Sequence, residues 1–129
     1  MTPSFEIRVA RASEEPAIVA FLRDHWNSRH IFVTNPEVLR WQHHHPDRAD
    51  EALTFVLAAR RGTGELLGLL GFLPFRRFDP SASWTELALA IWKVRDDAEA
   101  PGLGVLLLKF LIRELRPELV CAIGVSEIA

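Results

Sequence analysis

The sequence predicts an α/β domain, an α+β fold with a mixed sheet, whose elements follow the order β-α-α-β-β-β-α-β. Three observations support this fold class. Several segments are rich in apolar residues and bounded by turn residues, as strands are. Other segments begin with helix-start residues and carry apolar residues at helical spacing. The last three elements are a strand, a helix and a strand, an order that can form a parallel crossover. The strands are expected at 5–12, 53–60, 66–73, 84–94 and 119–125, and the helices at 13–26, 36–45 and 105–115.

The first three elements have clear boundary signals. Residues 5–9 alternate between apolar and charged side chains, which is typical of a half-buried strand. Ser13 then supplies a helix cap, and Pro16 follows where its missing N–H costs little. Residues 27–34 are expected to be a loop or a short strand. A second helix starts at Pro36, and the histidines that end it precede another proline, which restricts the residue before it.

The next three elements are predicted strands. A glycine-containing turn at 61–65 joins the first two, and the second is apolar on both faces, so it is expected to be central in the sheet. The third strand, 84–94, is expected to alternate strictly between its two faces. One face would carry Trp84, Glu86, Ala88, Ala90 and Trp92, and the other Thr85, Leu87, Leu89, Ile91 and Lys93.

The last helix is almost wholly apolar apart from one stripe. Lys109, Arg113 and Arg116 recur at i, i+4 and i+7, so they are expected on the solvent face. Pro117 stops the helix, and the apolar segment 119–125 is expected to be a final buried strand.

Composition excludes several classes of protein. The chain has 129 residues, which fits a single domain, and a net charge of −2, which gives no electrostatic reason to expect nucleic acid or an anionic membrane as a partner. A single cysteine, Cys121, excludes an internal disulfide framework and is expected to be a small buried side chain. The N-terminus lacks the pattern of a secretory signal, and no apolar run approaches the roughly 20 residues of a membrane helix, so a cytoplasmic location is expected.

The histidines do not predict a metal site. The three at positions 43–45 are consecutive, so on a helix they point about 100° apart and cannot all bind one ion from one face. No metal is therefore expected.

Residues 99–104 read Glu-Ala-Pro-Gly-Leu-Gly before the last helix. Glycines at a helix start let the backbone approach a phosphate, although in an ordinary strand–helix connection they may serve only to make the turn. Together with the element order, this run resembles the Gln/Arg-x-x-Gly-x-Gly/Ala loop of the GNAT family, the acyl-CoA-dependent N-acetyltransferases. Other short runs resemble GNAT-like proteins of bacterial surface-polysaccharide gene clusters: His25-Trp26, His30-Ile31-Phe32, Trp41-Gln42-His43 and residues 91–95.

The resemblance implies a set of site residues. Acetyl-CoA or another acyl-CoA would be the co-substrate, with its pantetheine arm in the gap where two strands splay apart. Glu86 would be the general base, because an amine must lose a proton to attack a thioester; the alternative is a carboxylate that is exposed or salt-bridged at an edge. Ser126 and Glu127 would lie near the thioester. The residues implied for cofactor binding are Trp92, Lys93, Val94, Gly102, Leu103 and Gly104. Those implied for the acceptor are His25, His30 and Phe32, whose alternative role is the packing of an aromatic helix pair.

The resulting hypothesis is an acyl-CoA-dependent N-acyltransferase that acetylates a small-molecule amine, with an amino sugar as one acceptor. The chain would form a single domain over residues 1–129, and it would be the N-terminal part of a longer domain if the distal strands of the family's plan are missing. A non-catalytic GNAT-like binding or assembly module is the alternative, because the sequence lacks the tyrosine that many family members use as an acid. A homodimer through the terminal strand is expected, since apolar edges are usually covered.

Overall fold

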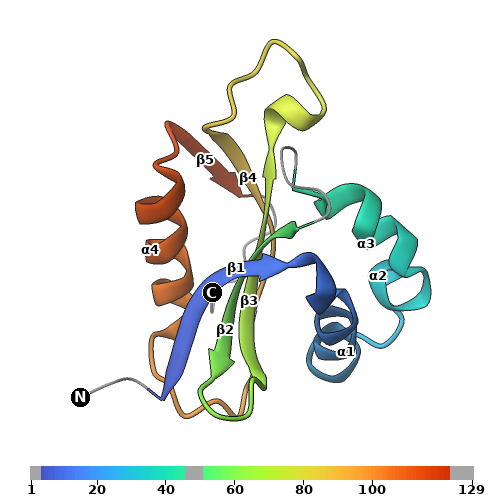
Figure 1. Cartoon of the computed structure of the whole chain (residues 1–129), viewed down its shortest axis with the longest axis vertical. Helices are drawn as coiled ribbons and strands as arrows, with labels where there is room; N and C mark the ends of the chain where they lie inside the picture. The colour runs from blue at the N-terminus through green and yellow to red at the C-terminus, as the bar shows by residue number, and fades with distance from the viewer. Residues whose placement is uncertain (1–3, 46–50, 123–129) are drawn as a thin grey trace.

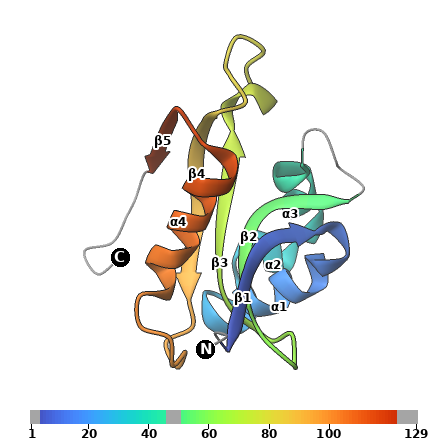
Figure 2. The same ribbon diagram turned by 60° about the vertical axis from the view of Figure 1, so that its left-hand side comes forward.

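In a computed structural model of the chain, which describes residues 4–45 and 51–122, a sheet separates two helical layers. Helices α1 to α3 cover one face of the sheet and α4 covers the other (Figures 1 and 2). The helices are α1 (Glu15–His25), α2 (Ile31–Thr34), α3 (Pro36–His43) and α4 (Leu103–Leu115). The strands are β1 (Phe5–Arg11), β2 (Ala52–Arg60), β3 (Leu66–Pro74), β4 (Glu86–Val94) and β5 (Leu119–Ala122), and two 3-10 turns are Ala12–Glu14 and Phe75–Arg77.

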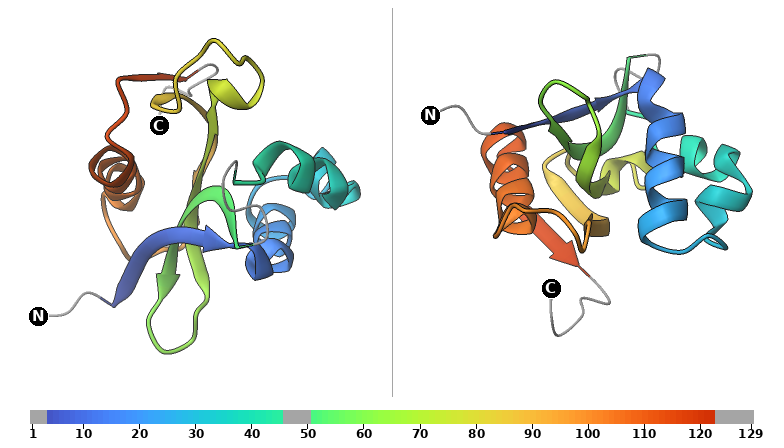
Figure 3. Two further views of the ribbon diagram at one scale, coloured as in Figure 1. Left: turned by 45° about the horizontal axis from the view of Figure 1, so that its top comes forward. Right: turned by 90° about the horizontal axis from the view of Figure 1, so that it is seen from below.

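The strands of the described residues form one sheet in the order β1-β2-β3-β4-β5. The first four are antiparallel to their neighbours, and β5 lies parallel to β4 after the crossover through α4. The predicted α/β class is therefore confirmed, and so is the predicted element order apart from one additional short helix, α2. Almost all residues of β2 and β3 are buried, because helices cover both faces of these strands (Figure 3).

Two apolar clusters hold the layers together. One joins α1, α2 and α3 to the sheet and includes Phe21, Phe32 and Phe55. The other joins α4 to the opposite face through Leu103, Leu107 and Leu111, which recur every fourth residue and are almost completely buried. Each buried leucine stabilises the fold by about 2 kcal/mol. The predicted solvent stripe of α4 is confirmed, since its lysine and two arginines are exposed.

The structure corrects several predicted boundaries. A short helix, α2, occupies part of the segment expected to be a loop or strand, because the His30 ring nitrogen accepts a hydrogen bond from the Phe32 N–H and caps it. Strand β4 begins at Glu86 rather than at residue 84, and α4 begins at Leu103. The described part of β5 ends at Ala122, and the remainder of the predicted last strand lies outside the described residues.

Candidate functional site

Strand β4 contains a β-bulge between Leu89 and Trp92. On β3, Leu70 faces Trp92 and Phe72 faces Leu89, so two steps on β3 span three on β4. The extra residue reverses the alternation of side chains. Leu89 and Trp92 both pack on the α4 side, whereas Ile91 joins the cluster under the other helices.

The bulge overturns one sequence prediction. Glu86 and Trp92 were expected on the same face of the strand, but the inserted residue moves Trp92 to the face that α4 covers. A strict two-residue period cannot survive an extra residue. Trp92 therefore points toward the start of α4, on the face of the sheet opposite to that of Glu86.

The described residues of β5 pair only with the first half of β4. The two strands pair from Glu86 with Leu119 to Leu89 with Ala122. Beyond this point, β4 continues to Val94 with β3 on one side and no described strand on the other. The second half of β4 thus lies at an edge of the described sheet, and it leads directly toward the loop before α4.

The N-terminus of α4 has a backbone that suits a close ligand. Gly102, at the N-cap, has a φ of 76°, a left-handed conformation that favours glycine, and no side chain caps the helix there. A Cβ on Gly104 would lie 3.4 Å from the Trp92 indole nitrogen, which donates a hydrogen bond of 3.1 Å to the Gly104 carbonyl. The structure therefore brings together Trp92, Gly102 and Gly104, which the sequence predicted as cofactor-binding residues.

The other predicted cofactor residues have more limited roles. The Leu103 side chain is 1% exposed and packs in the α4 cluster, so this residue offers only backbone groups. Val94 packs against the same cluster. The Lys93 ammonium forms an ion pair of 3.0 Å with Asp96, a residue of the loop that follows β4. Lys93 therefore already neutralises one acid of this loop.

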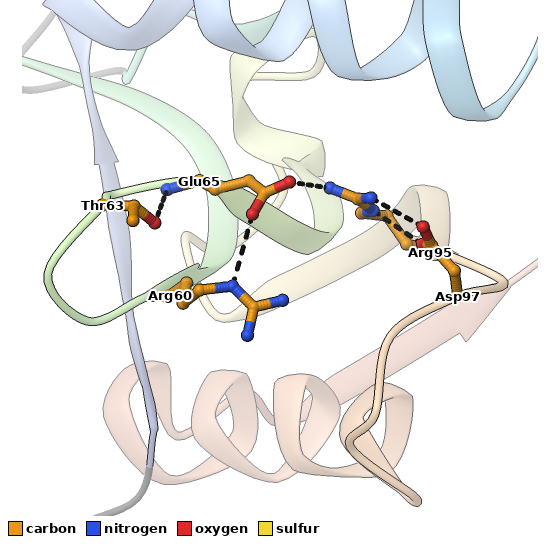
Figure 4. A network of polar contacts seen from close by, with 5 residues as sticks. All are labelled: Arg60, Thr63, Glu65, Arg95 and Asp97. Carbon is orange, nitrogen blue, oxygen red and sulfur yellow. Dashed lines mark hydrogen bonds and ion pairs between the residues drawn. The ribbon is translucent and has the colours of Figure 1, made fainter.

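A network of charges fixes the start of the same loop (Figure 4). The Arg95 guanidinium holds both carboxylate oxygens of Asp97 at 2.8 Å and also contacts Glu65, which lies in the turn between β2 and β3. Glu65 in turn accepts a hydrogen bond from Arg60. The hydrogen bonds from Arg95 lower the pKa of Asp97 to about 2, and the charge of His25 contributes. Hydrogen bonds from Arg95 and Arg60 likewise lower the pKa of Glu65.

Glu86, the predicted base, is the first residue of β4 and not a mid-strand residue. Its Oε1 accepts a hydrogen bond of 2.8 Å from the Ser83 N–H, so this oxygen closes the turn that precedes the strand. The carboxylate is only partly exposed, and within the described residues it forms no ion pair. The alternative of a salt-bridged Glu86 is therefore not seen in that part of the chain, and Oε2 has no hydrogen bond there.

The three predicted acceptor residues do not form one cluster of free side chains. His25 ends α1 and packs on Phe21, with ring centroids 5.1 Å apart, and its charge reaches Asp97. His30 caps α2, and Phe32 is 3% exposed within the core. Of the three, His25 alone contributes to the electrostatics of the loop that follows β4, through the pKa of Asp97. Trp26 and Ile31, which adjoin His25 and His30 in sequence, are about half exposed, at 47% and 50%.

His43 is a buried polar residue that the sequence did not distinguish from its neighbours. Its ring is fully buried and stacks on Phe55 with a centroid distance of 4.2 Å. Nδ1 lies 2.9 Å from the Thr54 hydroxyl and 3.2 Å from its carbonyl oxygen, to which it donates. Burial lowers the pKa of His43 to about 4, so the ring is neutral at pH 7.

Within residues 4–45 and 51–122, no three His, Cys, Asp or Glu residues are grouped to hold a metal ion.

No protein-family profile matches the sequence, and no curated protein is significantly similar to it. Solved structures do share its fold. The chain superposes on a GNAT-family N-acetyltransferase of Escherichia coli, solved with CoA, with a TM-score of 0.59, 17% identity, and coverage of 89% of this chain and 59% of that one. The chain has the GNAT fold.

Two further GNAT-fold structures show the same similarity. For N-acetylglutamate synthase of Neisseria gonorrhoeae, solved with coenzyme A and N-acetylglutamate, the TM-score is 0.57 with 20% identity, covering 90% of this chain and 23% of that one. For an acetyltransferase of the GNAT family from Staphylococcus aureus Mu50, the TM-score is 0.57 with 16% identity, covering 87% and 66%. The chain thus spans less than two thirds of the length of each of these three proteins.

One pair of predicted site residues and one observed ion-pair network differ in how far the sequence indicated them. Ser126 and Glu127, which were expected near the thioester, lie outside the described residues. The ion pairs of Glu65 and Arg95 were not predicted, because the two residues are 30 positions apart and only the β3–β4 register brings them together.

As for the membrane, no helix in the described segments has the length and apolar character to cross one.

Proposed function

We propose that this chain binds an acyl-CoA and transfers its acyl group, acetyl in the simplest case, to the amine of a small molecule. One observation carries the proposal: the bulged half of β4 leads into a loop that ends at an uncapped, glycine-started helix. Two of the GNAT-fold structures were solved with CoA, which supports this choice of co-substrate.

The residues present suit the anionic end of acyl-CoA through their backbone. The first N–H groups of a helix lack partners within the helix, and its dipole places roughly half a positive charge there. Both effects favour phosphate, and Gly102 and Gly104 keep side chains away from it. After the bulge no described strand pairs with the outer edge of β4, and the backbone N–H and C=O groups on that side would suit the amides of the pantetheine arm.

The proposed catalytic role is assigned to Glu86. The acceptor amine gives up a proton to a carboxylate as its nitrogen bonds to the thioester carbon; the C–S bond then breaks, and CoA leaves as a thiolate that takes up a proton. Oε1 of Glu86 is held by the Ser83 N–H, which leaves Oε2 to act as the base. The acceptor residues proposed from the sequence, His25 and His30, lie at the end of α1 and at the N-cap of α2.

Isothermal titration with acetyl-CoA is the first test. We expect saturable binding, and the absence of both heat and thermal stabilisation would exclude the enzyme proposal. Turnover is then measured as CoA release with a panel of amines that includes amino sugars. A protein-only blank is needed because Cys121 carries a free thiol. Glu86→Gln should lower turnover without weakening acetyl-CoA binding, and unchanged turnover would remove Glu86 from the mechanism.

A second candidate, a non-catalytic GNAT-fold binding module, is favoured by the charge of the loop. Asp96 and Asp97 are paired with cations, but Glu99 is exposed beside the helix start and would repel phosphate. Acetyl-CoA binding without turnover on any amine would support this role, as would no binding at all.

For either candidate, we propose a cytoplasmic protein that self-associates through β5, which lies at the edge of the described sheet.

A further inference from the structure

The turn between β2 and β3 lies beside the proposed CoA loop because of the sheet register. Gly68 of β3 faces Val94 of β4, and the Arg95 N–H donates a hydrogen bond of 2.9 Å to the Leu67 carbonyl. Continuing this antiparallel register past the end of the sheet places Glu65 opposite Asp97. The two segments are therefore neighbours although 30 residues separate Glu65 from Arg95.

Arg95 links the two segments with its side chain as well as its backbone. Its guanidinium makes a two-bond contact with Asp97 at 2.8 Å and a third contact with Glu65. The Arg95 side chain is 17% exposed, whereas those of Glu65 and Asp97 are 46% and 66% exposed, so water reaches the carboxylates of these pairs. The planar guanidinium can serve both carboxylates at once, which a lysine ammonium could not do with the same geometry.

The turn that carries Glu65 is itself held in place. Gly62 and Gly64 have φ angles of 90° and 74°, which suit glycine, and the Gly64 N–H donates to the Arg60 carbonyl. The Glu65 N–H donates to the Thr63 hydroxyl at 3.3 Å (Figure 4). Arg60 also donates to the Glu65 carboxylate at 3.3 Å. These hydrogen bonds hold the backbone and the carboxylate of Glu65 in the turn, so that the carboxylate can position the loop through Arg95.

We propose that Glu65 is a positioning residue for acyl-CoA binding: through Arg95 it holds the loop of residues 95–102, and so the first N–H groups of α4, in the shape that receives the anionic end of the co-substrate. This role rests on the proposed function. Glu65 acts through Arg95 and does not itself contact the co-substrate, since its negative charge would repel phosphate.

Glu65→Gln tests the role, with Glu15→Gln as a matched control. Glu15 makes a comparable ion pair of 3.0 Å with Arg40, which joins α1 to α3 and does not involve the loop. Two readouts are compared with the wild type: amide hydrogen exchange over residues 96–102, and the Kd of acetyl-CoA. Melting temperatures verify that both variants are folded.

We expect Glu65→Gln to speed exchange in the loop and to weaken acetyl-CoA binding, each by about two- to five-fold, since an ion pair with exposed carboxylates contributes only modestly. Glu15→Gln should match the wild type in both readouts. Arg95→Gln alone should cause a larger loss, because it also breaks the contact with Asp97, and adding Glu65→Gln to it should cause little further loss, because Glu65 acts through Arg95.

Equal loop exchange and equal Kd in Glu65→Gln and the wild type would overturn the proposal. A double variant whose loss equals the sum of the two single losses would also overturn it, because Glu65 and Arg95 would then act independently. If the wild type does not bind acetyl-CoA, the proposed function and the positioning role both fail. The exchange data would still show whether Glu65 orders the loop, so the two failures are distinguishable.

Discussion

Acidification from pH 7 to pH 5 is expected to destabilise this fold through one buried side chain, His43. Its ring is fully buried between Phe55 and Phe32, and desolvation lowers its pKa from 6.5 to about 4. The unfolded chain binds a proton at this residue below about pH 6.5, whereas the folded chain does so only near pH 4. Between these values the unfolded state binds more protons, so the free energy of unfolding falls as the pH falls.

The size of the effect follows from the two pKa values. One pKa unit corresponds to about 1.4 kcal/mol, so the difference between 6.5 and about 4 gives a loss of about 3 kcal/mol across the whole window. About 2 kcal/mol of this loss is expected by pH 5. A loss of that size is a large part of the stability of a domain of this length. Carboxylates such as Asp97, whose pKa is lowered to about 2, titrate below this range.

Urea unfolding followed by tryptophan fluorescence at several pH values measures this loss. In His43→Phe the aromatic stacking is kept and the titration is removed, so the unfolding free energy should change little between pH 7 and pH 5, even though the variant loses the bond to Thr54. His25→Gln is the control and should keep the wild-type slope. A wild-type stability that does not fall over this range, or an equal slope in His43→Phe, would refute the reasoning. If His43→Phe does not fold, the imidazole NMR signals of the wild type report the pKa of His43 directly.

Three further predictions concern other parts of the chain. Gly71→Ala should destabilise the fold by about 1–3 kcal/mol in urea unfolding, because a Cβ would lie 2.9 Å from a ring carbon of Phe55; an unchanged midpoint would show that the site can relax. Glu99→Gln should strengthen acetyl-CoA binding by about two- to five-fold at low salt, with a smaller gain at high salt, because it removes an exposed acid near the start of α4. Titration at two salt concentrations tests this, and equal Kd values for wild type and variant would count against a phosphate site there. Leu119→Lys should shift a dimer toward monomer in light scattering, since Leu119 is exposed on the edge strand β5; a wild-type monomer would rule out self-association through β5.

The order and class of the elements could be predicted from the sequence because their signals are local. β2 and β3 have continuous apolar runs, and almost all of their residues are buried in the structure. In α4, the leucines at helical spacing are buried as well. The short helix α2 was not predicted, because Ile31, Phe32 and Val33 have side chains that favour strands. Its cap comes from a ring nitrogen of His30, and histidine is not among the usual capping residues.

The β4 bulge was not predictable from the residues around it. No glycine or proline stands between Leu89 and Trp92, and a period of two residues cannot reveal where a register shifts. The burial of His43 was missed for a related reason. Three consecutive histidines give no sign of which ring faces the core, and that choice depends on how α3 packs against Phe55.

The candidate site likewise contains residues that the sequence predicted and contacts that only the tertiary structure brings about. The glycines at the start of α4 followed from a motif, whereas their contact with Trp92 depends on the β4 bulge. The link from Glu65 to Arg95 depends on the pairing of β3 with β4, which is a tertiary feature. Phe32 was proposed for the acceptor site, yet it lies in the core, where the alternative role in helix packing places it.

The central claim, that acyl-CoA binds at the start of α4, is tested most directly by NMR. Amide and indole signals of ¹⁵N-labelled protein are followed during titration with acetyl-CoA. We expect the largest shifts at the backbone amides of residues 102–105 and at the Trp92 indole, whose hydrogen bond to Gly104 lies at this helix start. Saturating acetyl-CoA that leaves these signals unchanged, or that shifts only signals elsewhere in the chain, would contradict the account.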